Sequence, residues 1–135
     1  MSKNINESYI SVASIDKANR KNGHMNAWLY FRKGVHHIPE DIGEQMEAFR
    51  KKCRERGYNI IGETFNFGDS HSSEQAINKI IASEAAVNYI LSPTLTTLSD
   101  NTQEFIELTR RLYEHGILFK SANSGFALVN PMLVF

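Results

Sequence analysis

Between Ala27 and Lys120 the sequence alternates short apolar runs with amphipathic segments, and this alternation constrains the fold more than any other feature. The apolar runs are typical of buried strands and cover residues 27–31, 59–65, 87–91 and 117–120. The amphipathic segments have apolar residues three or four positions apart and cover residues 41–56, 74–86 and about 100–115. We therefore predict an α/β fold with three layers, in which helices pack on a mostly parallel sheet of four or five strands.

The two ends of the chain are less regular. Residues 1–25 are predicted to be a polar leader or linker, although residues 8–13 are compatible with a short strand, and residues 26–135 are predicted to form the α/β domain. The spacing of Asp100 and Gln103 predicts a capping box at the start of the third helix. The apolar C-terminal segment is interpreted either as a fifth strand or as a docking surface, with these candidate interface residues: Phe126, Leu128, Met132, Leu133 and Phe135.

Composition excludes several classes of protein. The 135 residues are enough for one domain, and 41% of them are hydrophobic, which suits a globular protein with a core. No apolar run is long enough to span a membrane and no signal peptide is evident, so we expect a cytoplasmic protein without a membrane partner. Cys53 is the single cysteine, and the adjacent His36 and His37 would point apart, so we expect neither a metal site nor a cofactor.

The neutral net charge hides an asymmetry. Up to Arg56 there are eleven Lys and Arg residues against seven Asp and Glu residues, and from Gly57 onward there are four against eight. The positive charges gather in one predicted helix, at Arg50, Lys51, Lys52, Arg54 and Arg56. The run could contact phosphates, but acidic residues within it favour a solvated helix face.

In a parallel α/β sheet, sites lie beyond the carboxyl ends of the strands. A dinucleotide site would need several spaced glycines after the first strand, where only Gly34 is found, and a phosphate-binding P-loop is absent. A phospho-acceptor receiver domain would need carboxylates where this chain has Arg32, Lys33, Ser92 and Pro93. These three common functions of the architecture are therefore excluded.

Three motifs occur in an order that resembles a known family. Tyr30-Phe31-Arg32-Lys33-Gly34 stands where a Y-x-R-V-S motif would lie, and a helix with Gln45 near its start leads into Gly57-Tyr58-Asn59-Ile60. Residues 95–101 read L-T-T-L-S-D-N, in place of L-D-R-L-x-R-N. Over residues 26–122 the chain thus resembles the N-terminal catalytic domain of the serine recombinases, the resolvase and invertase family.

The resemblance implies a reaction that this chain is poorly equipped to perform. In the family the motif serine attacks a DNA phosphodiester and arginines stabilise the transferring phosphoryl group. Here Gly34 takes the place of the nucleophile, Thr97 and Asp100 take the places of two arginines, and Thr96 replaces an aspartate. The remaining matches to catalytic positions are Arg32 and Gln45. We therefore expect a domain that has lost strand cleavage, is not an enzyme, and acts through protein interaction or regulation.

Two alternatives remain open. A divergent recombinase could use another serine as its nucleophile, with DNA binding supplied elsewhere; the candidates are Ser70, Ser72, Ser73, Ser92 and Ser99. Its candidate DNA contacts are Arg32, Lys33, Arg50, Lys51 and Arg54. The other alternative is a binding module that holds a small anion through Arg32 and Lys33.

The resemblance also has implications for the binding partners of this chain. Family members continue into a long dimerisation helix and a helix-turn-helix DNA reader, and residues 26–135 are expected to lack both. We therefore expect a protein partner or self-association ahead of DNA, and a mobile-element or prophage setting fits the family.

Overall fold

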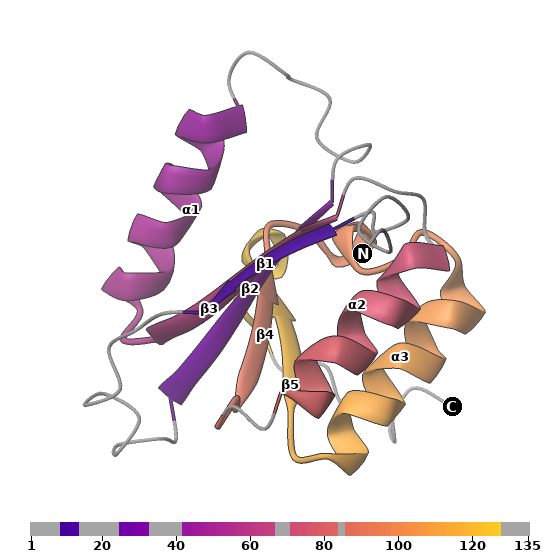
Figure 1. The fold of residues 1–135 in the computed structure, drawn as a ribbon. Helices are drawn as coiled ribbons and strands as arrows, with labels where there is room; N and C mark the ends of the chain where they lie inside the picture. Colours follow the sequence, from indigo (N-terminus) through magenta and orange to yellow (C-terminus); the bar gives the residue numbers. More distant parts are fainter. Residues whose placement is uncertain (1–8, 14–24, 33–41, 67–70, 84–85, 128–135) are drawn as a thin grey trace, which may run out of the picture.

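The structure, a computed structural model, describes residues 9–13, 25–32, 42–66, 71–83 and 86–127. These residues contain three α-helices, five strands and two short 3₁₀ helices, η4 and η5 (Figure 1). In chain order the elements are β1 (Tyr9–Ala13), β2 (Asn26–Arg32), α1 (Ile42–Glu55), β3 (Asn59–Asn66), α2 (His71–Ala82), β4 (Tyr89–Ser92), η4 (Leu95–Thr97), α3 (Thr102–Glu114), β5 (Leu118–Ser121) and η5 (Ala122–Ser124).

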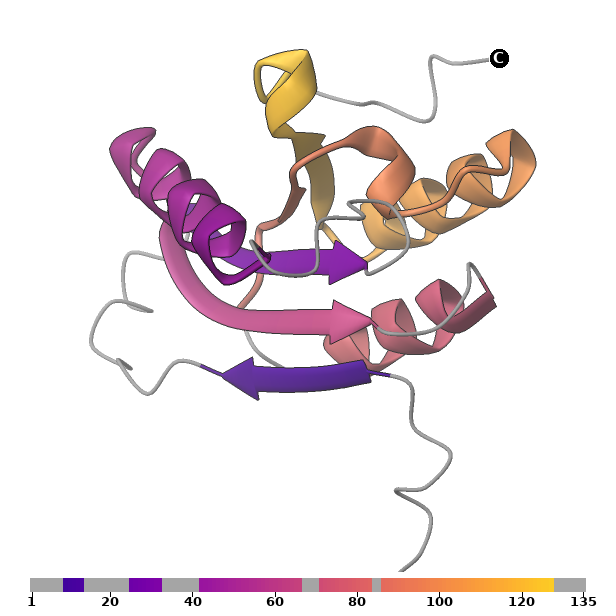
Figure 2. The same ribbon diagram turned by 90° about the horizontal axis from the view of Figure 1, so that it is seen from above.

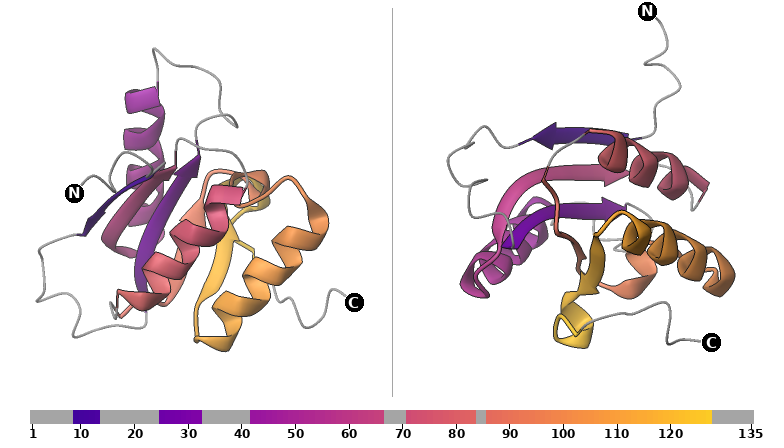
Figure 3. Two further views of the ribbon diagram at one scale, coloured as in Figure 1. Left: turned by 45° about the vertical axis from the view of Figure 1, so that its right-hand side comes forward. Right: turned by 90° about the horizontal axis from the view of Figure 1, so that it is seen from below.

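The five strands form one sheet in the order β1-β3-β2-β4-β5. Strands β3, β2, β4 and β5 are parallel, and β1 pairs antiparallel with β3 at one edge. Helix α1 covers one face of the sheet, while α2 and α3 lie side by side across the other (Figures 2 and 3). The three-layer α/β fold and its mostly parallel sheet are therefore as predicted.

The central strand β2 explains why the sequence forms two cores. All seven of its residues are buried, because both of its faces are covered by helices. Trp28 and Tyr30 face the core shared with α2 and α3, whereas Leu29 and Phe31 face the core shared with α1. This alternation is the two-residue period of a strand, and here both faces are apolar.

The Trp28 indole on β2 packs directly against Gly62 on β3. The pairing register shifts between Ala27 and Trp28, so that Trp28 lies opposite Gly62. The indole ring occupies the space that a β-carbon on Gly62 would need, and its Nε1 donates a hydrogen bond to Thr64 Oγ1 at 2.8 Å. Gly62 is therefore required by the position of the neighbouring indole.

The two ends of the described chain differ from the prediction. Among the described residues the fifth strand is β1, which lies within residues 1–25, the segment expected to be a leader. Phe126 and Ala127 form no strand, and residues 128–135 lie outside the described part of the chain. Phe126 is not extended because Gly125 and Phe126 both have positive φ, 69° and 60°, which places these two residues in a turn.

Helix α3 begins one residue later than the predicted capping box implies. Its N-cap is Asn101, whose side chain accepts a hydrogen bond from the backbone N–H of Glu104 at 2.8 Å. The Glu104 carboxylate in turn accepts a hydrogen bond from Ser99 Oγ at 2.6 Å. Asp100 is exposed and takes no part in the cap, so the predicted pair of Asp100 and Gln103 is wrong by one position.

Candidate functional site at the carboxyl edge of the sheet

The four parallel strands end in polar residues that are buried together at one edge of the sheet. Arg32, Asn66, Ser92 and Ser121 end β2, β3, β4 and β5, and all four are buried. Buried polar side chains require hydrogen-bond partners, so this edge is held by a layer of specific polar contacts. It is also the edge where a parallel α/β sheet places its sites.

Tyr30 lies at the centre of one half of this layer. Its hydroxyl forms a hydrogen bond with Ser73 Oγ at 2.7 Å and accepts one from Asn66 Nδ2 at 2.8 Å. Ser92 Oγ donates to the backbone carbonyl of Tyr30 at 2.7 Å. Burial raises the pKa of the Tyr30 phenol, so it stays protonated and serves as a neutral hydrogen-bonding group. The cluster joins β2 to β3, β4 and α2.

Arg32 forms the other half of the layer and is directed toward backbone carbonyls. Its Nε donates to the carbonyl of Thr97 at 2.9 Å and its Nη2 donates to the carbonyl of Thr96 at 2.8 Å. The side chain is buried, with 6% of the residue exposed. Among the described residues, no carboxylate lies within ion-pair distance of it. Arg32 therefore fastens η4 to the end of β2.

The positions predicted to replace the family's phosphate-binding arginines lie in and after η4. Thr97 is buried, while Thr96 and Asp100 are exposed. The hydroxyls of Thr96 and Thr97 both lie within hydrogen-bond distance of Thr94 Oγ1, at 3.1 and 3.0 Å. This segment brings hydroxyl groups and one carboxylate to the carboxyl edge, and it brings no cation.

Three of the five candidate serine nucleophiles are buried and hydrogen-bonded. Ser73 is bonded to Tyr30, Ser92 to the backbone of β2, and Ser99 to Glu104. None of these three hydroxyls is placed to reach an external phosphodiester. The other two serines, Ser70 and the side chain of Ser72, lie outside the described residues, as do Lys33 and Gly34.

The basic run on α1 is partly neutralised. Arg50 donates to the carboxylate of Glu63 through Nε at 2.5 Å and Nη2 at 2.8 Å, and it also pairs with Glu47 at 3.0 Å. The hydrogen bonds with Glu63 raise the pKa of Arg50. Lys51 is exposed, and Arg54 has 57% of its side chain exposed and lies 3.9 Å from Glu47. Of the candidate DNA contacts on this helix, only Lys51 and Arg54 face solvent.

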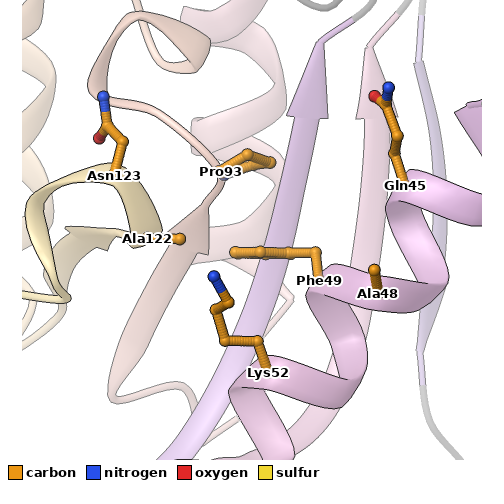
Figure 4. Close-up of a pocket in the computed structure, with 7 residues that line it drawn as sticks. All are labelled: Gln45, Ala48, Phe49, Lys52, Pro93, Ala122 and Asn123. Atoms are coloured by element: carbon orange, nitrogen blue, oxygen red, sulfur yellow. The ribbon is translucent and has the colours of Figure 1, made fainter.

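Gln45, the other match to a catalytic position, lines a groove of about 370 Å³ between α1 and the loops that follow β4 and β5. Figure 4 shows Phe49 and Lys52 extending from α1 toward Pro93 and Ala122 on the opposite wall. The remaining lining residues are Ala48 and Asn123. The groove is therefore lined by the apolar side chains of Ala48, Phe49, Pro93 and Ala122 and by the polar side chains of Gln45, Lys52 and Asn123.

One of the predicted interface residues is part of the core. Phe126 is 6% exposed, and its ring stacks on Phe49 at 6.3 Å and packs on Tyr58 at 5.8 Å. The guanidinium of Arg56 lies over the same ring at 5.1 Å. The other four candidates, Leu128, Met132, Leu133 and Phe135, lie outside the described residues.

Sequence reasoning missed the residues that complete this edge. Tyr30 was assigned to a strand and Asn66 to the loop after the second strand, and their side chains were not recognised as a hydrogen-bonded pair. The available signal was position, because Asn66 and Ser121 are polar residues that directly follow Phe65 and Lys120 at the carboxyl ends of two predicted parallel strands. Nothing in the local sequence indicated that Asn123 would face α1 across a groove.

In the ranges that the structure describes, no three His, Cys, Asp or Glu side chains are grouped closely enough to hold a metal ion. The helices of the same ranges include none that is long and apolar enough to cross a membrane.

Comparison with solved structures identifies the architecture. A resolvase-family site-specific recombinase from Streptococcus pneumoniae superimposes with a TM-score of 0.62 over 75% of this chain and 74% of its own, at 13% sequence identity. The N-terminal catalytic domain of TP901-1 integrase gives a TM-score of 0.57 over 73% of this chain and 78% of its own, at 19% identity. At the level of sequence, no family model and no curated protein matches. The chain has the fold of a serine recombinase catalytic domain, as its motifs predicted.

Proposed function

We propose that this chain is a serine-recombinase-like domain that no longer cleaves DNA and acts by contacting another protein, in a mobile-element or prophage setting within the cytoplasm. The fold is shared with a resolvase-family recombinase and with an integrase catalytic domain. The observation that carries the proposal is the placement of Arg32. A guanidinium that would serve a transferring phosphoryl group is instead occupied with the carbonyls of Thr96 and Thr97.

Several changes at the same edge support the loss of cleavage. Phosphoryl transfer depends on several cations acting together with a positioned nucleophile. Glycine at position 34 has no attacking atom, and the segment from Thr96 to Asp100 brings a carboxylate where positive charge would be needed. Removing one such charge-stabilising donor typically costs about two to three orders of magnitude in rate.

A role in protein contact is supported by the groove beside Gln45. Its walls present Phe49, Pro93 and Ala122, which suit an apolar partner. The net charge of the chain is zero, and Arg50 is neutralised by Glu63 and Glu47, so affinity for DNA phosphates would be small. These features favour the binding of a protein over the binding of DNA at this surface.

A covalent trapping assay tests the loss of cleavage. The purified chain is incubated with an end-labelled pool of duplex DNA of randomised sequence, quenched in denaturant, and examined for a protein–DNA adduct on a denaturing gel. An active resolvase with its own recombination site serves as the positive control. We expect no adduct from the natural chain, and none from the Gly34→Ser variant, because a serine alone does not restore the missing cations.

Two results would contradict the proposal. An adduct formed by the natural chain would revive the divergent recombinase, and serine-to-alanine variants would then locate its nucleophile. An adduct formed only by Gly34→Ser would mean that the rest of the site is intact and that Arg32 can leave its carbonyl partners.

Light scattering after size-exclusion chromatography tests the preference for protein. The chain is run alone and with a short DNA duplex, at low and at moderate salt. A dimer or larger species that ignores DNA supports protein contact. A monomer that shifts onto DNA in a salt-dependent manner would contradict it, because such a shift shows that phosphate contacts dominate.

A further inference from the structure

We propose that copies of this chain bind one another head to tail, with the side chain of Tyr113 on α3 of one copy seated in the groove between α1 and η5 of the next. The inference rests on the proposed function in one respect, since it names the partner for the protein contact, and it does not depend on whether DNA cleavage has been lost. Two exposed surfaces of the chain carry it, because they match in polarity and are opposite in charge.

The groove has the size and lining of a site for one aromatic side chain. Its volume of about 370 Å³ is near the lower end of the roughly 300–1,000 Å³ that ligand pockets occupy. A tyrosine has an apolar ring and a hydroxyl that needs a hydrogen-bond partner when it is buried. The groove supplies both environments, with Phe49 and Pro93 for the ring and the amide of Asn123 for the hydroxyl (Figure 4).

Positive charge stands along the α1 side of the groove. Lys52 is exposed and extends from α1 toward the opposite wall (Figure 4). Arg56 is also exposed, and its guanidinium lies 5.1 Å from the centre of the Phe126 ring, which stacks on Phe49. Because Phe49 lines the groove, Arg56 lies beside the groove as well. A partner for this surface therefore needs an apolar anchor with acidic groups next to it.

Helix α3 presents such a surface on the other face of the sheet. Tyr113 is 42% exposed and is the one exposed large hydrophobic residue of the described part of the chain. Glu114 follows it directly, and Glu107 lies seven residues earlier, so these two exposed carboxylates share one side of the helix. The half-buried Ile106 precedes Glu107 just as Tyr113 precedes Glu114. The exposed side of α3 thus combines an aromatic anchor with two carboxylates.

The charges of both surfaces lack an ion-pair partner within the described ranges; they are Lys52 and Arg56 beside the groove, and Glu107 and Glu114 on α3. Two arginines lie between the glutamates along α3. Arg110 is half-buried, and Arg111 pairs with Glu74 on α2 at 3.5 Å. The net charge of the chain is zero, so two copies have no overall repulsion to overcome. The charges of the groove and of α3 are therefore complementary between copies.

The fold places the two surfaces so that they can meet only between copies. Helix α1 covers one face of the sheet and α3 lies on the other (Figures 2 and 3), so α3 does not reach the groove of its own chain. A copy that is bound through its groove still presents its own α3 to a further copy. Contacts of this heterologous kind continue until the assembly closes into a ring, or grow without limit. We therefore expect assemblies larger than a dimer.

Two variants of the full chain each block one surface. The groove variant carries Lys52→Glu and Arg56→Glu, and the helix variant carries Tyr113→Ala. All three side chains are exposed, and circular dichroism verifies that the variants fold. The matched control carries Lys51→Glu and Arg54→Glu, which make the same change of charge at exposed positions of α1 that do not line the groove.

Sedimentation velocity measures the assembly. A contact built on one anchor is weak, so protein concentrations from about 10 µM to about 1 mM are needed, at low salt. We expect the natural chain to form species larger than a dimer, and the control to associate within about threefold of it. The groove variant and the helix variant should each weaken association by at least about tenfold.

An equimolar mixture of the two variants tests the head-to-tail geometry. The groove variant keeps a natural α3 and the helix variant keeps a natural groove, so one contact can form between them and no second one. We expect a one-to-one dimer that does not grow with concentration. Adding Glu107→Lys and Glu114→Lys to the groove variant should restore its self-association, because the charges are then exchanged between the two surfaces.

Four results would overturn the proposal. They are a natural chain that stays a monomer, a natural chain that stops at a dimer, a groove variant that associates like the natural chain, and a mixture that stays monomeric although the natural chain assembles. A dimer as the final species would mean that the same surface of both copies meets across a two-fold axis. None of these results touches the loss of cleavage, which covalent trapping tests separately.

Discussion

Replacing Arg32 by methionine distinguishes a structural arginine from a phosphate-binding one. Methionine keeps an unbranched apolar stem and removes both donors to the carbonyls of Thr96 and Thr97. A hydrogen bond that involves a charged group contributes roughly 1.5–3 kcal/mol to stability. The carbonyl of Thr96 can take water in place of its lost donor, because its hydrogen bond with Arg32 is only partly buried. We therefore expect Arg32→Met to lower the free energy of unfolding by about 3 kcal/mol.

Urea unfolding provides the measurement, because the fluorescence of the single tryptophan, Trp28, reports on a ring buried in the core. Arg32→Lys should lose about half as much stability, since an ammonium group can still donate a hydrogen bond to one of the two carbonyls. The same change at an exposed position, Arg54→Met, should alter stability by less than about 0.5 kcal/mol.

The reasoning is refuted if Arg32→Met lowers stability by less than about 1 kcal/mol while weakening the binding of a labelled DNA duplex at low salt. That result would mean that the guanidinium is held ready for a phosphate and that its contacts with η4 are incidental. The loss of cleavage would then have to rest on Gly34, Thr97 and Asp100 alone.

Three further predictions concern single positions. Gly62→Ala should lower the free energy of unfolding by roughly 1–3 kcal/mol, because the new methyl group must displace the Trp28 ring. If the variant is as stable as the natural chain in urea unfolding, the close contact between Trp28 and Gly62 is contradicted. Asn101→Ala should cost about 1 kcal/mol in the same assay, whereas Asp100→Ala should cost almost nothing if Asn101 is the N-cap. Burial raises the pKa of Cys53 from 9.0 to about 12. At pH 8 the thiolate fraction of Cys53 should therefore be about a thousandfold lower in the folded chain than in the unfolded chain, and labelling by a thiol reagent should be slower by the same factor. Rapid labelling of the native chain would show that Cys53 is accessible.

The central elements could be predicted because their signals are local. The apolar run from Ala27 to Phe31 is buried on both faces, as a central parallel strand requires, and the period of α1 places Phe49 and Cys53 on one face. The outer elements depend on contacts between distant residues. Strand β1 pairs Tyr9 with Asn66, and no local period indicates such a partner.

The candidate site was predictable in position but not in detail. The motif around Arg32 and the rule for parallel sheets together located the carboxyl edge. The direction of the Arg32 side chain, however, depends on where η4 places two carbonyls, and that follows from tertiary packing. Similarly, the apolar character of Phe126 led to the prediction that it lies in a strand or at an interface. Its ring is instead buried beyond a bend at Gly125, and this bend depends on a backbone conformation that the local sequence does not specify.

The order of strands in the sheet has a consequence for how the chain folds as it is synthesised. Strand β2 occupies the centre, but both of its neighbours, β3 and β4, follow it in the chain, and β1 cannot pair until β3 has left the ribosome. The sheet must therefore grow outward from β2, and β1 joins as the strand that closes one edge. Until it joins, the backbone donors and acceptors along the outer side of β3 are available to any other extended chain, including a second copy of this one. Among the described strands β1 comes first in the chain, but it can cover the open edge of β3 only after β3 has been made.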